Sequence, residues 1–124
     1  MIITKKLLFE GSIGEAEVMS LFDSGATYSC INPEIAIKLD KPVKIRRPFK
    51  VETASKVHYI EVTDRVSLDF YIDNHHFSDE FLIIPNLSED IIIGAKTMQS
   101  WRLKLDFEED KVLFDPKVTQ IKLI

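Results

Sequence analysis

The residues best suited to chemistry stand in one short run, Asp23-Ser24-Gly25-Ala26. Residues 16–22 before it are largely apolar and predict a strand that would carry the Asp23 carboxylate to its end. Ser24 offers a hydroxyl group, while Gly25 and Ala26 keep the turn thin enough for a second backbone or a substrate to approach. Asp, Ser and Gly are also ordinary turn residues. The run alone therefore leaves two interpretations open, a catalytic acid and a plain turn.

A second run, Ile91-Ile92-Ile93-Gly94, predicts another buried strand that ends in glycine, and residues 95–100 behind it suit a short helix. Together the two runs resemble the retropepsin-like family of aspartic proteases. In that family two apolar residues and Asp-Ser/Thr-Gly-Ala are followed, some tens of residues later, by two apolar residues, a glycine and a short helix. Residues 21–26 match the first motif, and Ile92-Ile93-Gly94 matches the second. The resemblance covers roughly residues 5–114.

The resemblance makes Asp23 the catalytic residue. Aspartic peptidases use two carboxylates that share a proton: one is the base for the attacking water, and the other, protonated, polarises the scissile carbonyl. This chain has one Asp-Ser-Gly run, so the second carboxylate has to be Asp23 of another copy. The resemblance therefore implies a homodimeric endopeptidase with its active site on a two-fold axis. Its substrates would be extended, largely apolar segments of peptides or proteins.

The resemblance also implies supporting roles. Ser24 would bond across the two-fold axis, and the strand that ends in Ile92-Ile93-Gly94 would brace the catalytic loop. The residues expected to contact substrate are Gly25, Ala26, Thr27, Ala54, Ser55 and Lys56. Many viral relatives carry an acid where this chain has Thr27, so contacts with the substrate backbone are expected to differ there. Residues 1–8 and 118–124 are candidates for an intersubunit sheet, because unpaired strand edges attract partners.

Residues 49–53 and 57–63 predict the two arms of a hairpin, with residues 54–56 at its tip. In the resemblance this hairpin is the flap that covers the substrate and excludes water. Flap tips of the family usually carry glycine, and this one has none. A second hypothesis therefore stays open, a retropepsin-like binding or dimerisation module with little or no proteolytic activity. A third is a structural barrel in which Asp-Ser-Gly is only a turn.

The rest of the chain predicts many short strands and two brief helices, which is typical of an all-β protein with a closed or partly closed barrel. Asn32, Pro33 and Glu34 supply a cap, a first-turn proline and a first-turn acid, so a helix is expected to begin there. It should end before Pro42. Further strands are expected at residues 4–10, 15–22, 66–72, 77–84, 90–93, 102–107, 111–114 and 118–124.

Composition fits one soluble globular domain over residues 1–124, because hydrophobic residues make up 45% and charged residues 29% of the chain. The net charge of -4 argues against a nucleic-acid or anionic-membrane partner. Lys44, Arg46, Arg47 and Lys50 form a local basic cluster. Because acidic residues surround this cluster in the sequence, it is interpreted as a solvated loop face.

The other reactive side chains predict no metal and no cofactor. His75 and His76 have no cysteine or clear pair of acids at ligand spacing. Cys30 is the only cysteine and is expected to be a small, half-buried side chain rather than a thiolate nucleophile. One unpaired cysteine fits a reducing compartment, and hence a cytoplasmic location. No apolar run is long enough to span a bilayer.

Overall fold

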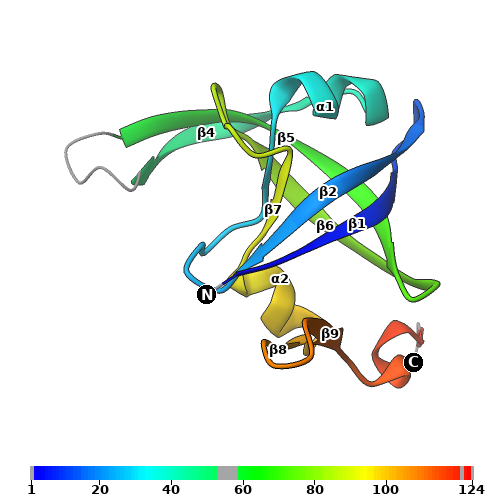
Figure 1. Cartoon of the computed structure of the whole chain (residues 1–124). Helices are drawn as coiled ribbons and strands as arrows, with labels where there is room; N and C mark the ends of the chain where they lie inside the picture. The colour runs from blue at the N-terminus through cyan, green and yellow to red at the C-terminus, as the bar shows by residue number, and fades with distance from the viewer. Residues whose placement is uncertain (1, 53–58, 121, 124) are drawn as a thin grey trace.

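The computed structural model describes residues 2–52, 59–120 and 122–123, and Figure 1 shows its path. The helices are α1 (Pro33–Leu39) and α2 (Ala95–Ser100), and η1 (Pro116–Thr119) is a 3-10 helix. The strands are β1 (Ile2–Glu10), β2 (Glu15–Asp23), β3 (Cys30–Ile31), β4 (Val43–Glu52), β5 (Tyr59–Ile72), β6 (His75–Ile83), β7 (Ile91–Ile93), β8 (Lys104–Asp106) and β9 (Lys111–Leu113). None of the helices in this described part is long and apolar enough to cross a membrane.

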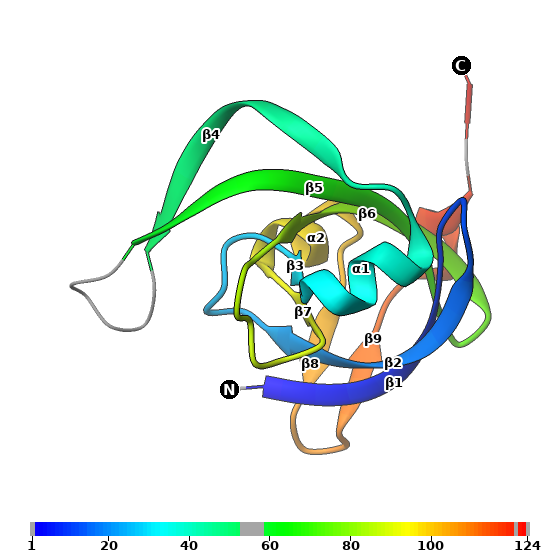
Figure 2. The same ribbon diagram turned by 90° about the horizontal axis from the view of Figure 1, so that it is seen from above.

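The strands close into a barrel, as the all-β prediction required. Neighbouring strands follow the order β1, β2, β7, β3, β6 and β5, and the second half of β5 pairs back onto β1 through Tyr71 opposite Leu8. Figure 2 shows the resulting ring from above, with α1 across its mouth. Closure leaves β4 outside the ring, as the terminal strand beside the first half of β5. The predicted fold class is confirmed.

The β4–β5 pair, called the arm below, projects from the barrel in both views (Figures 1 and 2). The sequence predicted separate strands at residues 57–63 and 66–72, but within the described residues β5 runs unbroken from Tyr59 to Ile72. The strand continues through Arg65 because this residue pairs with Val43 of β4 on one side and with Leu82 of β6 on the other. The hairpin tip predicted at residues 54–56 lies outside the described residues.

The basic cluster predicted to lie on a loop lies instead on β4, so that part of the interpretation is wrong. β4 begins at Val43, six positions before the strand that the sequence predicted from residue 49. Its exposed basic residues are Lys44, Arg46, Arg47 and Lys50. Such side chains suit an exposed strand as well as a loop, because strand periodicity places alternate residues in solvent.

The core of the barrel is aromatic. Phe9, Phe70 and Phe81 are fully buried, with the Phe9 ring 5.5 Å from Phe70 and 5.8 Å from Phe81 between centroids. Phe77 stacks on Phe70 at 5.6 Å and meets the edge of Trp101 at 5.2 Å. Large rings of this kind bury much apolar surface at fixed geometry. They therefore hold β1, β5 and β6 together in the core of the barrel.

Helix α1 begins as predicted. The Asn32 side chain accepts a hydrogen bond of 2.8 Å from Glu34 N, with Pro33 in the first turn. The turn between β1 and β2 docks on the other end of the helix, where Ser12 N and Oγ both donate to Asp40 Oδ2. Burial raises the pKa of Asp40, but the hydrogen bonds from Ser12 and Lys41 outweigh it and hold that pKa below its ordinary value.

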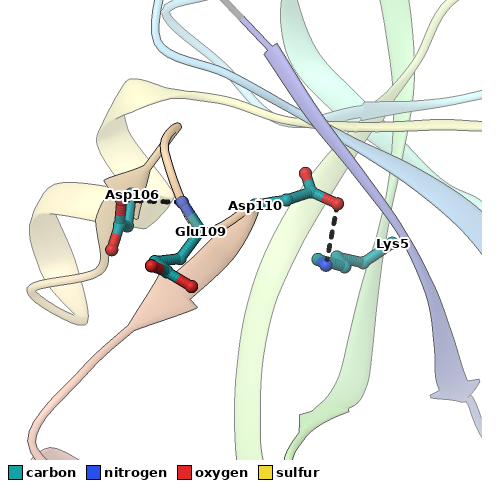
Figure 3. Close-up of polar contacts among 4 residues, drawn as sticks. All are labelled: Lys5, Asp106, Glu109 and Asp110. Carbon is teal, nitrogen blue, oxygen red and sulfur yellow. Dashed lines mark hydrogen bonds and ion pairs between the residues drawn. The ribbon is translucent and has the colours of Figure 1, made fainter.

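The predicted hairpin near the C-terminus is present as β8 and β9. Figure 3 shows how it is fastened: Lys5 Nζ of β1 lies 3.4 Å from Asp110 Oδ2, and Asp106 Oδ1 accepts the backbone N–H of Glu109 at 3.2 Å. Asp106 Oδ1 also accepts from Glu108 N at 3.1 Å. The carboxylate of Asp106 thus closes the turn, as acidic residues commonly do through local hydrogen bonds.

The last strand, predicted at residues 118–124, is wrong for the described residues. Residues Pro116–Thr119 form η1, and residues 120, 122 and 123 belong to no strand. Asp115 caps η1 by accepting from Lys117 N at 3.0 Å, and Thr119 Oγ1 donates to Pro116 O at 2.9 Å. A cap followed by proline favours a helical turn over a strand. The apolar composition of this tail was therefore overridden by its capping residues.

Candidate active site

Asp23 is the last residue of β2 and is half-buried. Its Oδ1 accepts a hydrogen bond of 2.9 Å from Gly25 N, and its backbone carbonyl accepts one of 3.1 Å from Ala26 N. A Cβ added at Gly25 would stand 3.1 Å from the same Oδ1, so a side chain there would press on the carboxylate. The loop therefore holds the acid with its own backbone, and glycine makes room for that contact.

Strand β7 lies directly beside β2 and supports the end that carries Asp23. The two strands are parallel, with Leu21 opposite Ile92 and Phe22 opposite Ile93. Phe22 and Ile93 are fully buried, whereas Ile92 is half-buried. Since burial of a large apolar side chain contributes about 1.5–3 kcal/mol, this packing fixes the strand end firmly. The arrangement is the brace that the resemblance implied for this second run.

Helix α2 fastens the loop that follows Asp23. Its N-terminal amides bond to loop carbonyls, Ala95 N to Ala26 O at 2.7 Å and Lys96 N to Thr27 O at 3.0 Å. The first amides of a helix have no partner inside it, so the loop satisfies them. Gly94 makes this approach possible, because a Cβ there would lie 2.6 Å from the carbonyl carbon and oxygen of Tyr28.

A buried hydroxyl pair completes the fastening, and the sequence did not single it out. Ser29 and Thr97 are 3% and 2% exposed, and their hydroxyl oxygens lie 2.5 Å apart. Ser29 Oγ also accepts from Gly94 N at 3.0 Å. The one available signal was Thr97 itself, a polar residue next to the buried Met98 on a short helix. Ser29 carried no signal, because an isolated serine after a turn is ordinary.

The structure brings most of the predicted site residues together. Ser24, Gly25 and Thr27 are exposed, and Ala26 is half-buried. Ser24 borders a hollow of about 460 Å³ between the loop, α2 and β8. Its lining residues include Ala95, Met98, Leu103, Leu105 and Phe107. The predicted substrate contacts Ala54, Ser55 and Lys56 lie outside the described residues.

Cys30 lies next to this site on β3, with Ile92 opposite it on β7 and Leu82 on β6. Burial raises the pKa of its thiol to about 12, and the negative charges of Glu89 and Asp23 add to the effect. The group is therefore a neutral thiol at physiological pH and cannot act as a thiolate nucleophile. It is half-buried, as predicted.

His75 and His76 each contact an oxygen atom of an aspartate. His76 Nε2 lies 2.9 Å from Asp69 Oδ1, and His75 Nδ1 lies 2.9 Å from the carbonyl oxygen of Asp73. Within residues 2–52, 59–120 and 122–123, no group of three or more His, Cys, Asp or Glu side chains is placed to hold a metal ion.

Comparisons with known proteins agree with this geometry. The protein retains the fold of the retroviral protease-like domain of Ddi1 from Leishmania major, with a TM-score of 0.67 and 18% identity over 93% of this chain and 89% of that one. It is also similar to EIAV protease in complex with the inhibitor HBY-793, with a TM-score of 0.59 and 16% identity over 84% of this chain and 91% of that one. At such identities the likeness shows the fold.

The family itself is shown by a sequence model. The model described as gag-polyprotein putative aspartyl protease matches residues 9–100, which include the Asp23 loop, β7 and α2. That span is well over half of the chain. The retropepsin-like resemblance is thereby confirmed, and the chain belongs to the gag-polyprotein putative aspartyl protease family.

Proposed function

We propose that the protein is an aspartic endopeptidase that works as a homodimer, with one Asp23 carboxylate from each subunit. The observation that carries the proposal is the mounting of Asp23: a half-buried carboxylate at the end of β2, in a loop that α2 fastens by two backbone hydrogen bonds. Such a mount suits a group that must hold one position during catalysis. Membership of an aspartyl protease family supports the same assignment.

The proposed chemistry needs the pair rather than the single acid. Two carboxylates roughly 3 Å apart cannot both ionise easily, so one keeps a proton. The ionised Asp23 takes a proton from water, whose oxygen attacks the scissile carbonyl carbon, while the protonated Asp23 gives its proton to the carbonyl oxygen. The diol intermediate then collapses: the carboxylate that is now protonated gives its proton to the leaving amide nitrogen, and the ionised one takes a proton from a diol hydroxyl, which restores the pair. The two acids titrate as a coupled system.

Half-buried apolar residues next to the arm suit an extended apolar substrate. Val62, Leu82 and Ile84 are buried there in a cluster separate from the barrel core. Partly buried apolar residues surround them, namely Cys30, Ile45, Phe49, Val51, Ile60 and Leu87. A peptide in strand conformation presents alternate side chains to such a surface and offers its backbone for hydrogen bonding. We therefore expect peptide or protein segments with apolar side chains to be the substrates.

The decisive experiment replaces Asp23 by Asn. Cleavage of a peptide library between roughly pH 3 and pH 7 should fall by about a thousandfold or more, because the shared proton and the base are both lost. Asp73→Asn is the matched control, since it removes another carboxylate at a turn where φ is 48°, a value that asparagine tolerates. Cleavage that survives in the Asp23 variant would refute the assignment.

A second candidate is a retropepsin-like binding or dimerisation module with little or no activity. The observation that favours it is in the sequence: residues 53–58 contain no glycine. This candidate predicts a dimer in sedimentation and no turnover of any library peptide across the same pH range. A monomer at high protein concentration would count against both candidates.

A further inference from the structure

The outer edge of β4 concentrates positive charge on a protein that is acidic overall. β4 is the terminal strand of the seven-stranded sheet, so in the described part of the chain only its inner edge is paired, with β5. Exposed basic residues stand along it at Lys44, Arg46, Arg47 and Lys50. Because the whole chain has a net charge of -4, this edge is a local positive surface rather than part of a basic protein.

An irregularity in the strand pairing sets two of these residues apart. Lys44 stands opposite Asp64, and the next regular pair is Phe49 opposite Val62. Residues 45–48 therefore bulge against a single residue of β5. Bulges of this kind redirect side chains away from the regular ladder.

Arg46 and Arg47 are in this bulge and are exposed, as are the lysines on either side. Lys44 and Lys50 face carboxylates across the ladder, at Asp64 and Glu61. The ion pairs formed among the described residues involve neither arginine of the bulge. Two consecutive exposed arginines therefore form no ion pair with a carboxylate of the described residues.

The basic residues and the bulge of β4 are explained in part by protection of an exposed strand edge. Charges, Pro48 and a bulge together keep a second copy of the edge from pairing with β4. Lysines are sufficient for that purpose. Arginine adds a planar set of donors that matches carboxylates in bidentate fashion, so adjacent free arginines form a receptor for acidic side chains as well as a barrier to like-charged strands.

We propose that the outer edge of β4 binds an extended, acidic segment of another protein, whose carboxylates contact Arg46 and Arg47. An extended segment fits because alternate side chains of a strand share one face, so its carboxylates can reach both arginines without backbone pairing across the bulge and Pro48. Nucleic acid is the weaker candidate, since the remaining surface of this acidic protein would repel a long chain of phosphates. The site is separate from Asp23, so the proposal does not depend on peptidase activity.

A second copy of this chain is a poorer occupant. The most acidic exposed hairpin, β8–β9, uses Asp110 to bind Lys5 and Asp106 to close its own turn, as Figure 3 shows. Asp106 and Asp110 are therefore engaged inside the subunit, and the other exposed acids of this hairpin, Glu108 and Glu109, lie in its turn rather than in an extended segment. Pairing of two β4 edges would bring Arg46 and Arg47 of both copies together, which is repulsive.

The test measures binding of two labelled peptides by fluorescence anisotropy. The probe alternates Glu and Thr, residues chosen for charge and extended backbone, and the matched peptide has Gln in place of Glu. The full chain carries Asp23→Asn, so that cleavage cannot consume the probe. Arg46→Gln with Arg47→Gln should weaken binding of the Glu peptide by about tenfold at low salt. The Gln peptide should bind the unaltered edge just as weakly.

The matched control removes two charges elsewhere. Lys111→Gln with Lys117→Gln changes net charge equally at exposed positions near the C-terminus, and binding should stay within about twofold. Shifts of the β4 backbone amides on addition of the Glu peptide, followed by NMR, should map the contact. Equal loss in both double variants would overturn the proposal, as would equal affinity for the Gln peptide. Single-stranded DNA that competes as strongly would also overturn it, and so would self-association that disappears with the arginines.

Discussion

The Asp23 loop and the arm belong to one sheet, yet different forces hold them. Short backbone hydrogen bonds to α2 and the buried Ser29–Thr97 pair fix the loop. In the arm, β4 is held by one ladder to β5 and by apolar residues around Val62, most of which are half-buried. Regions with few buried contacts open at lower free energy than those locked into the core. The difference separates a stiff mount for Asp23 from an arm that is held by fewer buried contacts.

The largest effect is expected for the alkylation rate of Cys30, which lies between the Asp23 loop and the arm. It pairs with Ile92 and packs under the arm, and its thiol has a pKa of about 12. At about pH 8, alkylation by iodoacetamide should therefore be about a thousandfold slower than for free cysteine, as followed by mass spectrometry. The urea-unfolded protein supplies the reference rate. A native rate close to that reference would mean that the arm opens readily and is held to the barrel more weakly than its contacts indicate.

Gly94→Ala tests how stiff the loop is. The added Cβ would overlap the backbone of Tyr28 at 2.6 Å, and backbone cannot yield as a flexible side chain does. We expect the free energy of unfolding to fall by about 2–4 kcal/mol in urea titrations.

Gly25→Ala is the matched control for that substitution. Its Cβ would meet only the Asp23 carboxylate at 3.1 Å on an exposed loop, so a loss below about 1 kcal/mol is expected. If both alanines proved equally mild, the loop would be more pliable than its contacts indicate.

Thr97→Val is expected to have an intermediate effect. It removes one hydroxyl of the buried pair at nearly constant shape and leaves Ser29 Oγ with Gly94 N as its remaining partner. Unfolding should become easier by about 1–2 kcal/mol. On the arm, Thr63→Val breaks only an exposed bond to the neighbouring Asp64 and should cost under about 0.5 kcal/mol. Similar losses at the two positions would erase the distinction between loop and arm.

The smallest effect is expected at Asp40, the residue after α1 that accepts hydrogen bonds from Ser12 in the turn between β1 and β2. Its folded pKa lies below its ordinary value of 3.8. The stability it contributes is therefore complete above that value and disappears as the pH falls through the folded pKa. Asp40→Asn should flatten this acid dependence in urea titrations, with a loss below about 1 kcal/mol at neutral pH because solvent screens the site. An unchanged acid profile would contradict the hydrogen-bond assignment to Ser12.

Local signals were enough to predict much of the fold. Alternating apolar residues predicted the second half of β5, and Asn32 with Pro33 predicted the start of α1 because both act within one turn. The two motif runs pointed to a strand beside the Asp23 strand, and β7 lies there. These features depend on residues close in sequence, which is the range over which patterns are informative.

What escaped prediction depends on partners distant in sequence. The prediction separated residues 57–63 from 66–72, whereas Arg65 joins β5 by pairing with Val43 of β4 and Leu82 of β6, which are distant in sequence. Ser29 meets Thr97 only after the chain has passed around the barrel. The pairing of two Asp23 residues and the cytoplasmic location remain predictions, since both concern what surrounds the chain rather than the chain itself.

One strand, β5, belongs to both regions: its first half pairs with β4 and its second half with β1. Its second half is anchored in the aromatic core, where Phe70 stacks on Phe9 and Phe77. The ring of Phe77 in turn meets the edge of Trp101, the single tryptophan of the chain. The fluorescence of this one indole is therefore the natural probe for any displacement of β5 that reaches the aromatic core.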